Sequence, residues 1–224
     1  MFRAALLIAR KDLRLIFGRG FGPAQALLLG LLLIFLFSLA GKTGEKVSPQ
    51  AAAAVFWMAS AFCQVLIFST LYGYEEGGPR FGLLCAPCPP QAVWLGKAVA
   101  GLLVLLVSQA VFLPASAVFL GQSLSPLWTT GLAMLLLVDV GIAALGSLLG
   151  ALSQGQSSRE SLLGIILFPL LTPLFLAGIR LGAAAFSGVM EESESGWFIL
   201  APAFDGIFIA AALVLFPHIY NAEE

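Results

Sequence analysis

Long apolar stretches separated by short polar linkers dominate this chain of 224 residues. A helix of about 20 apolar residues is long enough to cross the hydrocarbon core of a bilayer. Only 10% of the residues are charged, against roughly 25% in soluble domains, so a water-soluble core could not bury this much apolar surface. The sequence therefore predicts one domain over residues 1–224, an all-α integral membrane protein with six transmembrane helices. The expected spans are about 23–40, 51–72, 93–120, 127–152, 161–182 and 197–217.

The first 19 residues have the pattern of an amphipathic helix. One face carries apolar residues spaced by four, three, four and three positions, and another carries three arginines: Phe2, Leu6, Ala9, Leu13 and Ile16 against Arg3, Arg10 and Arg14. Such a helix lies in the membrane interface with its apolar face toward the acyl chains. Because the basic region is longer than that of a signal peptide and further spans follow, we expect the cleavage-like Ser38-Leu39-Ala40 to stay intact.

The lysines and arginines predict how the spans are oriented. With a cytoplasmic N-terminus, the inner segments hold Arg3, Arg10, Lys11, Arg14, Arg19, Arg80, Lys97 and Arg159, and the outer segments hold Lys42, Lys46 and Arg180. Eight positive residues inside against three outside satisfy the positive-inside rule. We therefore expect both termini in the cytoplasm and the chain in a plasma membrane, with lipid around it. The charges form no patch typical of nucleic-acid binding.

The stretch from Tyr72 to Lys97 differs from the other linkers. It is the longest stretch between apolar runs that carries charges of both signs, and three further prolines follow Pro79 within it. We call it the coupling segment. With the orientation above it faces the cytoplasm, where we expect a short amphipathic helix at the membrane surface against which a soluble partner could push.

Asp139, Arg180 and Asp205 fall inside the expected spans, where charge is costly and often functional. Asp139, near the middle of the fourth span, could gate a pathway or bind a polar substrate group. Its carboxyl could instead fix helix packing. The nearby Gly141, Gly146 and Gly150 favour this alternative, because glycines let helices approach closely. Arg180 and Asp205 lie toward the outer ends of the fifth and sixth spans. They could pair with each other or with an acidic substrate group, or Arg180 could extend to the interface.

Pro169 and Pro173 lie four residues apart inside the fifth span. Each removes a backbone donor and bends a helix. A span with two such residues can serve as a hinge or line a cavity, and a simple irregularity of packing is the alternative interpretation.

The remaining motifs give little support to an enzymatic site. Cys85 and Cys88 form a C-x-x-C pair without the βαβ pattern of a thioredoxin-like enzyme, and a metal would need two further ligands. His218, the only histidine, could be an axial haem ligand or a solvated side chain at the end of the last span. Gly41-Lys42-Thr43 lacks the first glycine of a P-loop, so an ATPase that drives this protein would be another chain.

Three stretches together resemble the CcmB family, the permease subunits of the bacterial cytochrome c maturation system. ARKDLRLIFGRG is similar to the opening of that family. In the coupling segment, residues match an acidic-Gly pair, a leucine run and a Ser-Pro pair: Glu76, Gly78, Leu83, Leu84 and Pro87. FPLLTPLFLAG, Phe168–Gly178, is similar to the family's proline-containing helix, with matches at Pro169, Leu170, Pro173 and Gly178. The chain departs from the family pattern at Glu76-Gly77-Gly78, Ala86-Pro87 and Cys85.

The resemblance implies an ABC-2-type exporter permease that is not itself an enzyme and works with a separate ATPase, CcmA. It also implies association with the haem-handling subunit CcmC, the small CcmD and the haem chaperone CcmE. Haem would be the cargo of the complex, and ATP would bind to the partner. The expected ATPase contacts are Glu75, Glu76, Gly78, Arg80, Leu83, Leu84 and Pro87. An exporter for another substrate, a non-transporting scaffold and a redox enzyme built on Cys85 and Cys88 remain the alternatives.

Overall fold

The computed structural model describes residues 1–19, 21–41, 46–73, 88–123, 125–152, 157–190 and 196–221. Within these ranges the chain is helical apart from short connections. The helices are α1 (Phe2–Arg19), α2 (Phe21–Ala40), α3 (Pro49–Gly73), α4 (Pro90–Phe119), α5 (Trp128–Leu152), α6 (Ser157–Ser187) and α7 (Trp197–Asn221). The prediction of an all-α membrane protein is confirmed, since α2 to α7 each hold a segment that is long and apolar enough to cross a membrane.

The helix ends follow local chemistry. α3 starts at Pro49, whose missing N–H suits a first helical position, and the preceding Ser48 accepts the N–H of Ala51 on its Oγ at 3.3 Å. α6 continues to Ser187, beyond the expected end at residue 182, because the alanines at 183–185 favour helix. It stops where Gly188 adopts a φ of 76°, a left-handed conformation that suits glycine.

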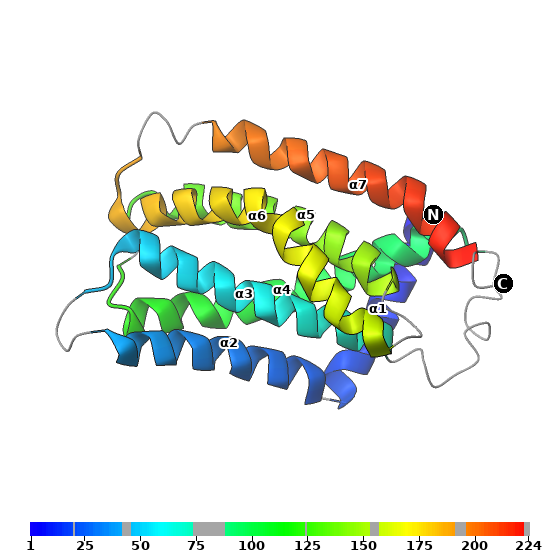
Figure 1. The fold of residues 1–224 in the computed structure, drawn as a ribbon, viewed down its shortest axis with the longest axis horizontal. Helices are drawn as coiled ribbons and strands as arrows, with labels where there is room; N and C mark the ends of the chain where they lie inside the picture. The colour runs from blue at the N-terminus through cyan, green and yellow to red at the C-terminus, as the bar shows by residue number, and fades with distance from the viewer. Residues whose placement is uncertain are drawn as a thin grey trace.

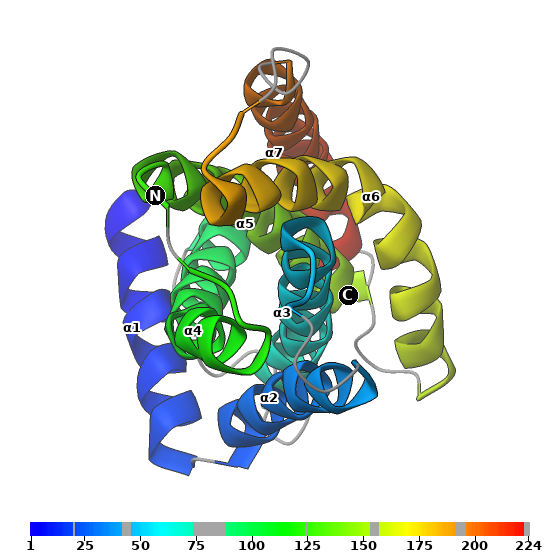
Figure 2. The ribbon, with the colours of Figure 1, turned by 90° about the vertical axis from the view of Figure 1, so that its left-hand side faces the viewer.

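α2 to α7 form a bundle, and α1 lies across one end of it. Figure 1 shows α2 to α7 running along the long axis of the molecule, with α1 at one end of the bundle, which we call the α1 end. Figure 2 looks along the bundle and shows α1 running crosswise beside α4. α3 ends, α4 begins and α7 ends at the α1 end (Figure 1). This arrangement is the one expected for an interfacial helix that precedes a transmembrane bundle.

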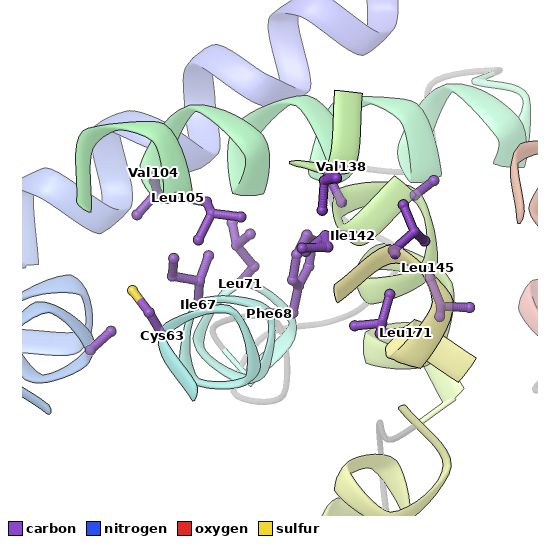
Figure 3. Packing of buried hydrophobic residues seen from close by; sticks show 14 of the residues in the cluster. Cys63, Ile67, Phe68, Leu71, Val104, Leu105, Val138, Ile142, Leu145 and Leu171 are labelled. Carbon is purple, nitrogen blue, oxygen red and sulfur yellow. The ribbon is translucent and has the colours of Figure 1, made fainter. Parts of the chain in front are cut away.

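The core lies among α3, α4, α5 and α6. Figure 3 shows side chains of α3 meeting those of α4 on one side and those of α5 and α6 on the other. The labelled members are Cys63, Ile67, Phe68, Leu71, Val104, Leu105, Val138, Ile142, Leu145 and Leu171, all buried. α3 and α5 are the most enclosed of the spans, whereas α2 and α7 have the smallest share of buried residues. Leucine and phenylalanine on those outer surfaces fit contact with lipid.

Candidate functional site

Asp139 lies in a polar cluster at the centre of the bundle. Its side chain is completely buried, and its Oδ1 accepts a hydrogen bond from Nε2 of Gln109 on α4 at 2.9 Å. The same Nε2 lies 3.3 Å from the Oγ of Ser60 on α3, and that hydroxyl donates to the carbonyl of Phe56 at 3.0 Å. We call Ser60, Gln109 and Asp139 the polar core cluster. It joins α3, α4 and α5, and among the described residues Asp139 Oδ2 has no hydrogen-bond partner.

A second polar contact crosses the same region. Gln64 of α3 donates from Nε2 to the carbonyl of Ile142 on α5 at 3.0 Å. No water reaches these polar groups in the apolar interior, so they must bond to one another. The bonds therefore hold α3, α4 and α5 in fixed relative positions. In the polar core cluster, Asp139 Oδ2 could accept a proton or one more hydrogen bond. All three members of the cluster are nevertheless buried from solvent.

Asp205 lies on α7, outside the polar core cluster, and faces α5. It is 5% exposed on α7, and neither carboxylate oxygen has a hydrogen-bond partner in the part of the chain that the structure describes. Its Oδ1 packs directly on Gly141 of α5, where a Cβ would collide with it. Arg180 is exposed on α6. The ion pair that the sequence allowed between Arg180 and Asp205 is not formed, because Asp205 turns toward α5.

Pro169 and Pro173 lie in the middle of α6. Figure 1 shows that α6 bends about halfway along its length. Because Pro173 has no N–H, the carbonyl of Pro169 loses its usual partner four residues on. Pro169 also lines a shallow groove of about 470 Å³ on one face of α6, together with Phe168, Thr172, Phe175, Leu176 and Ile179. The groove is almost wholly apolar, and Thr172 turns its hydroxyl onto the carbonyl of Phe168 at 2.9 Å.

The expected ATPase contacts, Glu75, Glu76, Gly78, Arg80, Leu83, Leu84 and Pro87, lie outside the described residues, as does Cys85. The two borders of the coupling segment are described. Cys88 is a partly exposed free thiol. His218 is exposed and hydrogen-bonds the carbonyl of Val214 through Nδ1 at 2.9 Å. In the described part of the chain, no three His, Cys, Asp or Glu side chains gather in a way that could hold a metal ion.

Sequence reasoning missed the partners of these groups. Gln64 and Gln109 are buried amides inside apolar spans, and polar residues of that kind commonly bond across transmembrane helices. Lys97 and Asp12 are also buried, although the sequence places both in charged stretches near the membrane surface. The available signal was their spacing: Asp12 continues the row of Ala5 and Ala9 on α1, and Lys97 stands among small residues on α4.

The family model described as CcmB protein matches residues 3–222. A relative from Pseudomonas aeruginosa, Heme exporter protein B, is 26% identical over 195 residues, which cover 86% of each chain. The family match extends from α1 to the end of α7 and includes the polar core cluster, the coupling segment and the proline-containing α6. The chain therefore belongs to the CcmB family.

Proposed function

We propose that this chain is the membrane permease subunit of an ABC transporter complex for cytochrome c maturation in a bacterial inner membrane. It couples ATP hydrolysis by a separate ATPase subunit to haem delivery, with release of the haem-loaded chaperone on the periplasmic side. The observation that carries this proposal is the CcmB match over residues 3–222. The relative named Heme exporter protein B supports haem as the cargo.

The geometry of the α1 end supports the site proposed for the ATPase. α3 ends at Gly73 and α4 begins at Pro90 beside the crosswise α1. The α1 helix carries Arg3, Arg10, Lys11 and Arg14. Positive residues concentrate on cytoplasmic segments of membrane proteins, so we place the α1 end and both termini in the cytoplasm, where an ATPase would reach the coupling segment.

In this proposal the part of the coupling segment around Glu76–Pro87 forms a short helix that rests in a groove of the ATPase. Leu83 and Leu84 anchor it by apolar burial, which stabilises by about 1.5–3 kcal/mol per fully buried side chain. Glu75, Glu76 and Arg80 set the register of docking more than its affinity, and Gly78 and Pro87 shape the ends of the helix. Closure of the ATPase then tilts α3 and α4, and the bent α6 relays that movement to the rest of the bundle.

The complex includes further partners. A CcmC-like subunit handles haem, a CcmD-like subunit accompanies it, and a CcmE-like chaperone carries haem away. Haem is cargo and ATP belongs to the ATPase, so the permease itself performs no covalent chemistry. Because the polar core cluster is closed and built of helix-joining hydrogen bonds, we assign it to packing and leave it outside the route of haem.

A double substitution tests the docking site. Leu83→Asp with Leu84→Asp removes the apolar anchor, so we expect the tagged protein to insert normally and to lose the ATPase on co-purification. The matched control is Val189→Asp with Met190→Asp, an exposed apolar pair just after the end of α6, which should retain the ATPase. α6 ends on the side of the bundle opposite α1 (Figure 1). Equal retention by the two variants would place ATPase docking elsewhere.

The alternatives predict different outcomes. A non-transporting scaffold works normally when the ATPase subunit binds ATP but cannot hydrolyse it, whereas the proposed permease then stops delivering haem. An exporter for another substrate keeps the ATPase dependence but leaves cytochrome c maturation intact when the chain is deleted. Measuring haem-loaded chaperone and mature cytochrome c in both strains separates the three functions.

A further inference from the structure

A lysine is fully enclosed where the coupling segment joins α4. Lys97 is 1% exposed and is among the largest completely buried side chains of the described residues. Burying an ammonium group is costly unless it is paired and hydrogen-bonded. Its Nζ donates to the carbonyl of Leu71 at 2.8 Å, lies 3.7 Å from Oδ2 of Asp12 and sits 4.5 Å from the centre of the Tyr72 ring. We call Asp12, Leu71, Tyr72 and Lys97 the Lys97 cluster.

The cluster joins three helices at one point. Asp12 belongs to α1, Leu71 and Tyr72 to the last turn of α3, and Lys97 to the start of α4. The carbonyl of Leu71 is among the last four of α3, which have no donor within the helix. Lys97 therefore caps the end of α3, where a positive charge also suits the helix dipole.

α1 is seated closely enough for this contact. Ala5, Ala9, Asp12 and Ile16 form its buried face. Gly96, next to Lys97, allows the approach: a Cβ there would lie 2.8 Å from the carbonyl oxygen of Ala5 and 2.8 Å from Cβ of Ile8. Any larger residue at 96 would push α1 away from α4 and separate Asp12 from Lys97.

A hydrogen-bond chain continues from the cluster into the central helix. Ser147 of α5 donates from Oγ to the carbonyl of Trp94 at 3.0 Å, so the hydroxyl of Tyr72 must be the donor in its 2.8 Å bond to Ser147 Oγ. Trp94 in turn donates from Nε1 to the carbonyl of Ala144 at 3.2 Å. Both borders of the coupling segment are thereby fixed to α5 as well as to α1.

We propose that Lys97 is a positioning residue for energy coupling, and that the Lys97 cluster makes α1, the end of α3 and the start of α4 move as one body. A displacement of the coupling segment then reaches α1 and α5 and is not absorbed by bending at the two helix ends. The inference rests on the proposed function, because it takes the coupling segment as the place where the ATPase acts.

The test is the amount of haem delivered, measured as haem-loaded chaperone released, per ATP hydrolysed by the complex purified from its own membranes. Lys97→Met keeps most of the side-chain volume and removes the charge. We expect it to retain the ATPase subunit and to hydrolyse ATP, while haem delivered per ATP falls about tenfold, as for substitutions between coupled sites. The same substitution at Lys46, an exposed lysine shortly before the start of α3, should leave the ratio at the wild-type value, because α3 starts at the end of the bundle opposite α1 (Figure 1).

A wild-type ratio in an assembled Lys97→Met complex would overturn the inference. A role in folding alone would lower the yield and the ATPase activity together and would leave the ratio unchanged, which also overturns it. If Lys97→Met does not assemble, Asp12→Asn decides, because it keeps the shape of Asp12 and removes its charge. The proposed function fails separately, if the intact wild-type complex purifies without any ATPase subunit.

Discussion

The surroundings of Asp139 favour a role in holding helices together over a role in binding a ligand. The amide of Gln109 donates to Asp139 at 2.9 Å, and the same amide contacts Ser60 on a third helix. Buried polar groups commonly hold transmembrane helices together in this way. The residue thereby sets the relative positions of α3, α4 and α5.

Two substitutions at Asp139 have different expected effects on stability. Asp139→Ala removes the acceptor of a buried amide, which costs about 1–3 kcal/mol, so its thermal unfolding temperature in detergent should fall. Asp139→Asn keeps an oxygen in the same place and should unfold near the wild-type temperature. If the role is packing, the asparagine variant also delivers haem at the wild-type rate. Normal stability with lost delivery would instead show that the carboxylate takes part in transport.

At the scale of the element, α5 and α7 meet where a glycine faces a carboxylate. A Cβ at Gly141 would collide with Oδ1 of Asp205 and lie 3.0–3.1 Å from the methyl groups of Leu174. The two helices can approach only because position 141 has no side chain.

We expect Gly141→Ala to destabilise the protein by about 1–3 kcal/mol, the usual effect of overpacking a core. Gly206→Ala is the matched control, since a Cβ there meets no atom within 4 Å. Thermal unfolding of both variants measures the difference. Asp205→Ala in the Gly141→Ala background should recover part of the loss, and no recovery would mean that the carboxylate is not the obstacle.

The bend of α6 gives a prediction about movement. Replacing Pro169 and Pro173 by alanine restores two backbone donors, and each proline in a helix interior disfavours the helix by about 3 kcal/mol relative to alanine. We expect the double variant to fold and bind the ATPase but to deliver less haem per ATP, because a straighter α6 transmits less motion. Pro114→Ala, a single exposed proline of α4, is the control. Unchanged haem delivery per ATP in the double variant would mean that the bend of α6 serves packing and not the transmission of movement.

The α1 helix shows what periodicity can and cannot predict. The spacing of Ala9 and Ile16 correctly indicates an amphipathic helix, yet both side chains pack inside the protein, whereas Phe2 and Leu6 from the same expected face are exposed. Apolar spacing does not distinguish a surface that meets lipid from one that meets another helix. Apolar runs predicted the six spans more reliably, because the thickness of the bilayer fixes their length.

Across the whole molecule, some residues of the candidate site could be predicted from the sequence and others could not. The proline pair and Asp139 stand out in sequence because proline and charge are rare inside apolar spans. The Lys97 cluster could not be found in that way, since it depends on contacts among residues of α1, α3 and α4 that only the fold brings together. Its charges also suggest solvent exposure when they are read along the chain.

In the proposed function, a separate ATPase drives this membrane subunit for haem delivery. Affinity purification of the tagged chain from its own membranes, with mass spectrometry of the partners and a haem absorbance scan, tests it most directly. We predict recovery of an ABC ATPase together with a haem-containing membrane subunit. Purification of an intact complex that contains no ATPase would contradict the claim.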